Sequence, residues 1–534
     1  MEEKKQQILS RRRFLKGAAV GAGAIALTGV ATNQSHSAPI PKKWDMVTDV
    51  VVIGYGGAGA CAALESARAG ASVLLLEKTE VPGGSTMLSG GIVYAAGTKL
   101  QKSEGIEDTP EAMYKYLMAC GQGRAVPELV KLASEMSSQN IDWLAEMGAV
   151  FTKELLAMSG METEPEYKAV TAPKKRGHRV KGTGSALFKV LADSVKKEKN
   201  IKILTGTRGL RLITRATSTG SNSEVIGVKA DRKGSEVNIR ANKAVILTTG
   251  GIMPGQETEG WLKDYSPDIA KCIPAGSPSA TGDGYRMGIF CGGALKALNT
   301  GGTLPAVLFP GSKMAGIMYA NIWGLPNIYV KKDGTRFFDE GANYVLVSEA
   351  MFEKKATTAY CIFDASTVKK AFDLVAKGIE ITRTIALGID PRNLDEQVKA
   401  GLLWKGNTVS ELAAAMAVDG AGLEKTLEVY NRNAESGKDP EFNRTKALAP
   451  LKTGPFYGIK INPGLVCHDG GLSINTKAQV LDSFDQVIPR LYAAGRDSVG
   501  IFGGRYPASG GAISDLLTFG RMAGKTASTE KPWK

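Results

Sequence analysis

A glycine-rich turn between a strand and a helix limits the fold of this chain more than any other feature. The run DVVVI at residues 49–53 reads as a buried strand, GYGGAG at 54–59 opens an apolar helix ending near Arg68, and a second strand at 72–76 precedes Glu77. A lone G-x-G-x-x-G motif is weak evidence for a nucleotide site. Here, however, it lies between a strand and a helix, with an acidic residue about 20 residues further on. The pattern predicts a dinucleotide site, with the pyrophosphate at the helix N-terminus and the acid on ribose hydroxyls.

Further glycine-rich segments favour FAD over NAD. The run KTEVPGGST at residues 78–86, with SGG at 89–91, follows directly, and strand-to-glycine turns recur at 244–251 and 491–495. No second G-x-G-x-x-G is present for NAD(P)H. One pyrophosphate site assembled from distant segments is typical of a large FAD fold, so the sequence predicts an α/β protein with a discontinuous Rossmann-like domain.

The N-terminus reads as an export signal. SRRRFLK at residues 10–16 precedes an uncharged Ala/Gly-rich stretch, 17–31, that is too short to cross a bilayer. We expect residues 1–38 to be a twin-arginine signal peptide, with small residues for cleavage at 35–38. The mature protein is expected in the periplasm or on the exterior of the cell envelope, and not as an integral membrane protein.

Length, charge and cysteines narrow the function. A chain of 534 residues suggests two domains. Beyond residue 38 there are 61 basic and 51 acidic side chains, a formal charge of +10, which suits an acidic partner surface. No nucleic-acid motif is present, so nucleic acid is not an expected partner. The six cysteines form no C-x-x-C pair, which argues against a metal site, an iron–sulfur cluster or covalent haem.

Three more motifs carry a family resemblance: TGDG at residues 281–284, the segment 328–340 ending in RFFDE, and GGL at 470–472. With the glycine turns, they make the chain resemble the flavoproteins that include fumarate reductases, soluble flavocytochrome c, urocanate reductase and 3-ketosteroid dehydrogenases. The resemblance spans roughly residues 47–525.

The resemblance implies an FAD-binding domain in two parts, residues 47–300 and 461–534, with an inserted α+β cap (substrate) domain at 301–460. A helix that opens with a capping box at Thr408 would belong to the cap. Family members that attach FAD covalently use a histidine near the position of Ser85. This stretch holds only glycine, serine and threonine, so FAD is expected to be non-covalent.

The predicted cofactor-binding residues come from the glycine turns, the acid after the second strand, and the family motifs. They are Gly54, Gly56, Gly57, Ala58, Gly59, Glu77, Lys78, Gly84, Ser85, Thr86, Ser89, Gly90, Gly91, Thr249, Gly250, Asp283, Gly495, Arg496, Gly511, Ala512 and Ile513. Arg496 stands where many FAD proteins have an acid. Asp497 follows it, and the sequence leaves open which of the two contacts the cofactor.

The substrate prediction depends on which residues replace the fumarate-type set. Fumarate-type relatives have a proton-donating arginine, a substrate-binding arginine and a histidine in their sites. The resemblance implies that this chain has Tyr344 in place of the first, Pro507 in place of the second, and Cys467 at or beside the position of the histidine. Without those cationic side chains, a dicarboxylate substrate would lose charge-assisted hydrogen bonds, so the sequence disfavours a substrate of this kind. The ketosteroid dehydrogenase branch fits better: there Tyr344 would be catalytic, while Tyr506 and the Gly510 amide would donate to a ketone oxygen. Donors of this kind stabilise an enolate by about 3 to 4 kcal/mol each.

The predicted function is an FAD-dependent reductase of a C=C bond conjugated to a carbonyl, acting on an enone or ketone, with the flavin N5 supplying hydride and Tyr344 the proton. A phenol with a pKa near ~10 is protonated at neutral pH, which favours reduction. A separate c-type cytochrome or quinol-linked carrier would supply electrons. The alternatives are a 3-oxosteroid dehydrogenase, a fumarate-type reductase, and an electron-relay flavoprotein in which Tyr344 and Tyr506 only pack.

Overall fold

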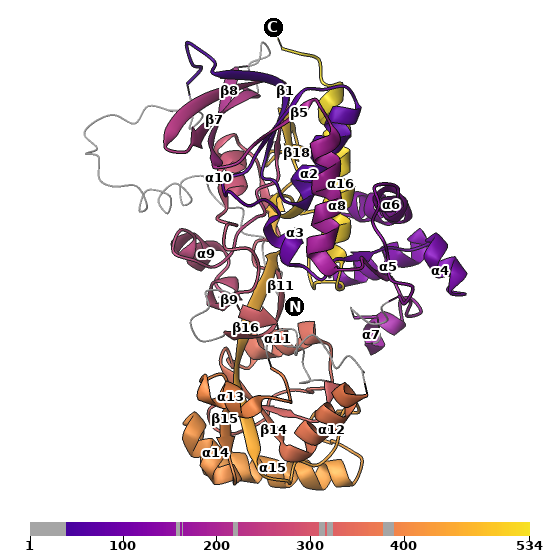
Figure 1. Cartoon of the computed structure of the whole chain (residues 1–534), viewed down its shortest axis with the longest axis vertical. Helices are drawn as coiled ribbons and strands as arrows, with labels where there is room; N and C mark the ends of the chain where they lie inside the picture. The colour runs from indigo at the N-terminus through magenta and orange to yellow at the C-terminus, as the bar shows by residue number, and fades with distance from the viewer. Residues whose placement is uncertain are drawn as a thin grey trace, which may run out of the picture.

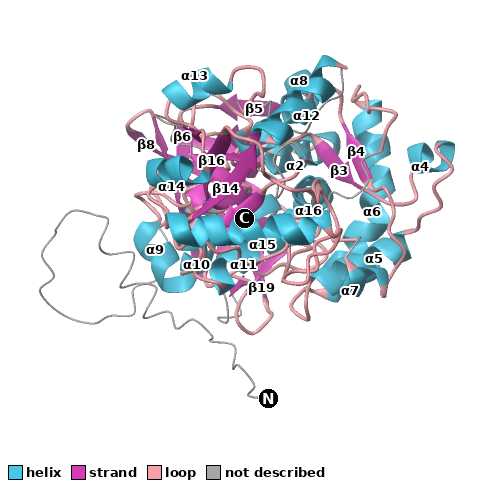
Figure 2. Ribbon diagram, turned by 90° about the horizontal axis from the view of Figure 1, so that it is seen from below, coloured by secondary structure: helices cyan, strands magenta, loops and turns pink. Residues whose placement is uncertain are grey.

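The computed structural model describes residues 39–155, 161–162, 164–216, 223–308, 315–317, 324–377 and 389–533. The predicted export signal at residues 1–38 lies outside the described residues. Two sheets follow one another along the long axis (Figure 1), and seen along that axis the strands occupy the middle with helices around them (Figure 2). Within the described ranges, no helix is both long and apolar enough to cross a membrane.

The first sheet is built on a parallel core in the order β19-β8-β1-β2-β5. Its strands are β1 (Met46–Ile53), β2 (Val73–Leu76), β5 (Ile201–Leu204), β6 (Thr207–Ala216), β7 (Ser223–Arg232), β8 (Ser235–Leu247), β18 (Gln479–Leu481) and β19 (Val487–Ala493). The aliphatic ends of β1, β2 and β8 are fully buried, as expected for parallel strands covered on both faces.

The helices of the first domain come from both ends of the chain, and α2 (Gly57–Arg68), α10 (Asp283–Phe290) and α16 (Gly511–Thr529) among them contact the sheet. The others are α3 (Gly84–Leu88), α4 (Lys99–Ser103), α5 (Pro110–Cys120), α6 (Pro127–Glu146), α7 (Pro165–Lys168), α8 (Thr183–Lys197) and α9 (Glu259–Tyr265). Helix α16 packs along α2, where Gly520 and Gly524 allow close backbone contact with Ala58 and Ala62. The C-terminal segment therefore completes a domain that the N-terminal segment begins.

The second sheet is mainly antiparallel, and most of its helices lie at the far end of the molecule (Figure 1). Its strands are β9 (Ile273–Pro274), β11 (Gly301–Leu308), β12 (Ala315–Ile317), β13 (Ile328–Val330), β14 (Ala359–Asp364), β15 (Trp404–Gly406) and β16 (Phe456–His468). The helices are α11 (Tyr344–Glu353), α12 (Ala365–Ala376), α13 (Leu394–Lys399), α14 (Val409–Met416) and α15 (Gly420–Glu435). We call this part the cap.

A buried ionic cluster organises the cap. The Glu340 carboxylate accepts hydrogen bonds from Arg336 at 2.7 Å and from Arg444 at 2.9 Å, and Asp439 binds the same Arg336 at 2.8 Å. Both glutamate oxygens and both guanidinium groups are inaccessible to solvent or nearly so. The RFFDE motif therefore has a structural role in the cap.

Two long antiparallel strands connect the cap to the first domain. Gly302 pairs with Cys467, and further along the same ladder Ala306 of β11 pairs with Asn462 of β16. The opposite end of β16 pairs with β14 inside the cap, from Ala359–Ile461 to Asp364–Phe456. We call the paired stretch of β11 and β16 the neck.

Local expectations from the sequence are confirmed with small shifts. Strand β1 begins three residues before the expected 49–53, and α2 ends at Arg68 as expected. Thr408 caps α14, accepting from the Glu411 amide at 3.1 Å, while the Glu411 side chain accepts from the Asn407 amide at 2.7 Å. Two further small sheets, β3 (Ile92–Tyr94) with β4 (Gly177–Arg179) and β10 (Leu295–Lys296) with β17 (Gly471–Leu472), complete the described strands.

Candidate active site

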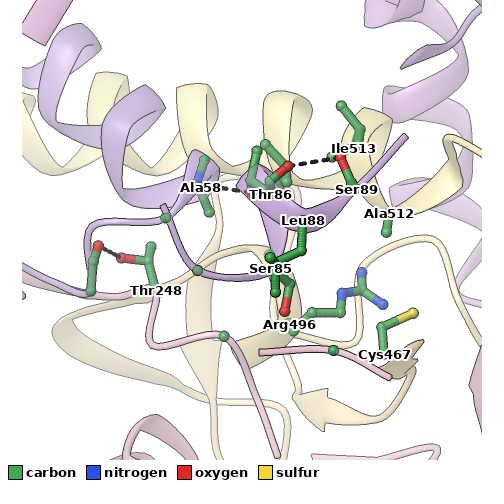
Figure 3. Close-up of a pocket in the computed structure, with 18 of the residues that line it drawn as sticks. Ala58, Ser85, Thr86, Leu88, Ser89, Thr248, Cys467, Arg496, Ala512 and Ile513 are labelled. Carbon is green, nitrogen blue, oxygen red and sulfur yellow. Dashed lines mark hydrogen bonds between the residues drawn. The ribbon is translucent and has the colours of Figure 1, made fainter. Parts of the chain in front are cut away.

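A cavity runs from the carboxyl ends of β1 and β8 to the neck (Figure 3). The first glycine turn at 54–57, the second at 249–250 and the third at Gly495 all line it, although about 440 residues of sequence separate the first turn from the third. At the other end it is lined by Gly302 and Leu304 of β11 and by Val466 and Cys467 of β16. The fold thus brings the predicted cofactor turns together with the entrance to the cap.

Three long helices begin at this cavity with glycine caps. Gly56 precedes α2, Gly182 precedes α8 and Gly510 precedes α16, and none of these helices has a side-chain cap or an acidic residue in its first turn. Residues at all three starts line the cavity. The positive ends of three helix dipoles favour an anionic ligand there.

Glycine also keeps the backbone of the first turn accessible. Gly54 has φ +106°, and a Cβ there would lie 2.3 Å from the Thr248 carbonyl oxygen. Next to it, the Gly57 amide donates to Thr86 Oγ1 at 3.1 Å, which joins the first turn to α3 (Figure 3). Only a chain without side chains at these positions fits this path.

Two acidic residues bind backbone amides and cationic side chains around the cofactor turns. The Glu77 carboxylate accepts from the Tyr55 amide at 3.0 Å, from the Thr79 amide at 2.9 Å and from Thr79 Oγ1 at 2.8 Å, and Glu77 lines the cavity. Asp283 is bound by Lys78 at 3.1 Å and by Arg208 at 2.7 Å. Burial is the largest single effect and acts to raise the pKa of this carboxyl, but the two cations together lower it.

Asp497 ties the second glycine turn to the third. Its carboxylate accepts from the Thr249 amide, from Thr249 Oγ1 at 3.0 Å and from the Gly251 amide at 3.1 Å. Burial raises its pKa to about 6. Arg496 lines the cavity and Asp497 does not, so the structure separates the two residues that the sequence left open.

Arg496 is held between two buried carboxylates. Its guanidinium binds Asp515 at 2.5 Å and Asp469 at 3.2 Å, and it lies over the Phe502 ring at 3.9 Å from the centroid. Burial raises the pKa of Asp469 to about 7, against the lowering effect of Arg496. The Asp469 Oδ1 atom also accepts from Cys467 Sγ at 3.3 Å, so this cluster reaches the cavity wall at Cys467 and Arg496 (Figure 3).

The two predicted catalytic tyrosines line one cavity from opposite domains. Tyr344 is the first residue of α11 in the cap, and its hydroxyl lies 3.4 Å from Ser509 Oγ. Tyr506 stacks on Phe502 at 5.7 Å, and its hydroxyl accepts from the Ala512 amide at 3.3 Å. Burial raises the pKa of Tyr506 well above its ordinary value. Its hydroxyl therefore stays protonated and can donate a hydrogen bond into the cavity.

All predicted site residues line the cavity except Gly59, Gly91 and Gly511. A Cβ on Gly59 would lie 1.9 Å from the Gly54 carbonyl oxygen, so this glycine serves helix–strand packing. Gly91 has φ +63° and abuts Thr183, and Gly511 packs on Pro507. These three glycines pack against neighbouring segments and do not line the cavity themselves.

Several lining residues were not predicted. Arg179 and Thr183 come from β4 and the start of α8, Arg208 comes from β6, and Ser509 lies with its hydroxyl 3.4 Å from that of Tyr344. The glycines around Thr183, in the run GTG at 182–184, were a signal for a helix start that could have been used. Arg208 lies in a strand with no local motif, so nothing in the sequence marked it.

The cavity fits an anionic dinucleotide. Besides the helix starts, the Nε atoms of two lining arginines, Arg179 and Arg496, are buried without a hydrogen-bond partner in the described structure. The histidines of the described part, His178 and His468, are buried against backbone carbonyls and do not line the cavity. Within the described ranges, no cluster of side chains has the composition of a metal site.

Comparisons with known proteins identify this architecture. Residues 49–513 match the sequence profile of the FAD binding domain family. The chain is 35% identical over 491 residues to the fumarate reductase (cytochrome) of Shewanella frigidimarina, covering 90% of this chain and 77% of the relative. It is 32% identical over 485 residues to the urocanate reductase of Eggerthella lenta, covering 90% and 74%.

Among solved structures, the 3-ketosteroid-Δ4-(5α)-dehydrogenase of Rhodococcus jostii is similar with a TM-score of 0.71 and 28% identity, covering 92% of this chain and 98% of that one. The predicted family and fold class are confirmed. The chain belongs to the FAD binding domain family and is an FAD-dependent oxidoreductase that acts on carbon–carbon single or double bonds.

Proposed function

We propose that this protein reduces a C=C bond conjugated to an uncharged carbonyl, with Tyr344 as proton donor and with Tyr506 and the Gly510 amide as hydrogen-bond donors to the carbonyl oxygen. The observation that carries the proposal is that the cavity formed by the three glycine turns is lined at its cap side by two phenols from opposite domains. Bound FAD would supply the hydride in this reaction.

The cofactor would be held without a covalent bond. The glycine turns and the starts of α2, α8 and α16 would receive the pyrophosphate, and Glu77 would accept ribose hydroxyls. Support for non-covalent binding comes from Ser85, which lines the cavity in a stretch without histidine, and from the positions of the described histidines away from the cavity.

Tyr506 suits the role of a carbonyl donor. Its pKa is raised by burial first and then by nearby acidic groups, so the phenol keeps its proton through the physiological range. Its oxygen already accepts the Ala512 amide, which leaves the hydroxyl proton for a ligand. A fixed donor of this kind stabilises negative charge developing on a carbonyl oxygen by about 3 kcal/mol.

Tyr344 suits the role of a proton donor. It is buried at the start of a cap helix, and Ser509 Oγ lies 3.4 Å from its hydroxyl, so the phenol is held at the cavity wall by groups from both domains. A phenol with a pKa near ~10 is protonated at neutral pH and can transfer its proton to carbon.

The charge of the lining favours a neutral substrate near the tyrosines. Gly302 lies against both Tyr506 and Cys467, and Leu304 follows on the same strand, so the described wall there is uncharged. Among the lining cations, Lys78 and Arg208 are paired with Asp283 and Arg496 with Asp469 and Asp515, whereas the Nε atom of Arg179 has no partner in the described structure. A dicarboxylate would gain little charge-assisted binding from paired cations.

A second candidate, a fumarate-type reductase, is supported by the 35% identity to a fumarate reductase and by Arg179, whose Nε atom is buried without a partner. A 3-oxosteroid dehydrogenase working in the oxidising direction is supported by the similarity to the Rhodococcus jostii structure. For either of these functions, the cofactor-binding site would be the same, and the residues around Tyr344 would determine which substrate binds.

The proposal includes export and a separate electron source. Residues 10–16 match a twin-arginine signal, and the chain has no second dinucleotide motif and no C-x-x-C-H haem motif. Electrons would therefore arrive from a c-type cytochrome or a quinol-linked carrier outside the cytoplasm.

The test is anaerobic reoxidation of the dithionite-reduced flavoprotein by 2-cyclohexenone, 4-androstene-3,17-dione or fumarate. We expect an enone to reoxidise the flavin and fumarate to do so poorly. Tyr344→Phe should slow reoxidation at least a hundredfold with FAD content unchanged. Tyr457→Phe, a cap phenol stacked on Phe363 away from the cavity, is the matched control. Rapid reoxidation by fumarate alone, or wild-type rates in Tyr344→Phe, would contradict the proposal.

A further inference from the structure

An ion pair links the two domains next to the catalytic tyrosines. Arg505, the residue before Tyr506, places its Nε atom 2.8 Å and 3.0 Å from the two carboxylate oxygens of Glu349. Glu349 lies on α11, the cap helix whose first residue is Tyr344. The pair therefore joins the loop that carries Tyr506 to the helix that carries Tyr344.

The loop that carries Arg505 is anchored to the first domain. The Arg505 amide donates to the Cys120 carbonyl at 2.8 Å, and the Tyr116 hydroxyl donates to the Pro507 carbonyl oxygen. Gly503 and Gly504 approach the backbone around the end of α5 so closely that a Cβ on either would lie 2.4 Å to 2.6 Å from it. The position of Tyr506 is thus set by α5.

The position of Tyr344 is set by the cap. Asn343 caps α11 by accepting from the Val345 amide at 2.9 Å, so Tyr344 and Glu349 belong to one regular helix. A shift of α11 relative to α5 would therefore move Tyr344 relative to Tyr506 by a similar amount.

The Arg505–Glu349 pair is partly buried, so salt screens it less than a pair of fully exposed side chains. The side chains of Arg505 and Glu349 are 19% and 33% exposed, whereas Glu166, which binds Arg505 from the first domain's own helix α7, is 60% exposed. Tyr167 adds a contact at 3.2 Å to the same guanidinium. Arg505 is thus fixed on one side by its own domain and reaches the cap on the other.

We propose that Arg505 is a positioning residue whose ion pair with Glu349 fixes α11 against the loop of Tyr506, and so sets the placement of the two phenols. The assignment rests on the proposed function for the roles of Tyr344 and Tyr506. The link itself does not depend on those roles, because it concerns how the cap is held.

The test compares Glu349→Gln, Arg505→Gln and their double variant with Glu166→Gln as the matched control, all as FAD-loaded full chains. Glu166→Gln removes a carboxylate from the same guanidinium without breaking the link to the cap. Two readouts are needed: the radius of gyration from small-angle X-ray scattering, and kcat and KM for reoxidation of the reduced flavin by an enone.

We expect Glu349→Gln and Arg505→Gln to increase the radius of gyration and to lower kcat by about tenfold to a hundredfold, with KM changing less, since a misplacement near 1 Å has effects of that size. The double variant should be no worse than either single one. Glu166→Gln should match the wild type in both readouts.

Wild-type scattering and kcat in Glu349→Gln would overturn the proposal, and so would a larger radius with unchanged kcat, since the pair would then hold the cap without positioning Tyr344. If the wild-type protein reduced no enone, the proposed function would fail. The scattering comparison would still show whether the pair holds the cap.

Discussion

Replacing Gly59 by alanine sets two physical effects against each other. Gly59 lies in the first turn of α2, where alanine is favoured over glycine by about 1 kcal/mol. A Cβ at this position would, however, lie 1.9 Å from the Gly54 carbonyl oxygen and 2.9 Å from Thr248 Oγ1. Because the nearest atom belongs to the backbone of the first glycine turn, the start of α2 must move by roughly 1 Å to admit the methyl group.

We therefore expect Gly59→Ala to lower the free energy of unfolding by about 3 kcal/mol, as overpacking does in a rigid site, and to lose most of the bound FAD. Gly54→Ala should do the same, since its Cβ would lie 2.3 Å from the Thr248 carbonyl oxygen and its φ of +106° is strained for alanine. Gly70→Ala is the control. It has φ +86° but no atom within 4 Å of its Cβ, so only the backbone strain of about 1 kcal/mol remains.

The assay is urea unfolding followed by tryptophan fluorescence, together with the ratio of flavin to protein absorbance after purification. The expected order of stability is wild type, Gly70→Ala, and then the two turn variants, with full FAD only in the first two. If Gly59→Ala kept its FAD and was as stable as the wild type, the close packing of α2 on the first turn would not be what fixes the cofactor seat.

Two further predictions concern buried carboxyl groups. Burial raises the pKa of Asp469 to about 7, so the native protein holds a proton that the unfolded chain releases near pH ~4. The contribution of this group to the free energy of unfolding therefore falls as pH rises from about 4 to about 7. In Asp469→Asn, urea titrations at pH 5 and pH 8 should show a smaller loss of stability with pH than in the wild type. An equal loss in both proteins would contradict the raised pKa. Glu340→Gln should cost about 3 to 5 kcal/mol in unfolding titrations, because two buried guanidinium groups lose their shared carboxylate. In contrast, Glu435→Gln at a surface pair should cost less than about 1 kcal/mol, and equal costs would refute the buried-pair argument.

The cofactor half of the fold could be predicted because its signals are local. A strand, a glycine turn and a helix lie within about 20 residues around Gly56, and the conformations that glycine alone allows leave a pattern in the sequence. The turns near Gly250 and Gly495 repeat that pattern, and the structure places all three on one cavity. Family resemblance then supplied Tyr344 and Tyr506, which have no local pattern of their own.

The contacts that set the geometry between segments could not be predicted in this way. Asp497 reaches across about 250 residues of sequence to Thr249, and Arg505 reaches back to Glu349 in a different domain. Arg208 is an ordinary strand residue until the fold places it beside Asp283. Such pairings depend on tertiary packing, which leaves no periodicity or spacing in a single sequence.

The neck has a consequence for how such a protein can change its substrate. The chain leaves the cofactor domain and returns to it through positions that face each other, since Gly302 pairs with Cys467. The segment between these two positions therefore begins and ends side by side, on paired strands of the neck. Insertions or deletions in the cap beyond the neck would leave the alignment of the nucleotide-binding strands unchanged, so the substrate-binding part of the protein can vary while its cofactor-binding part is kept.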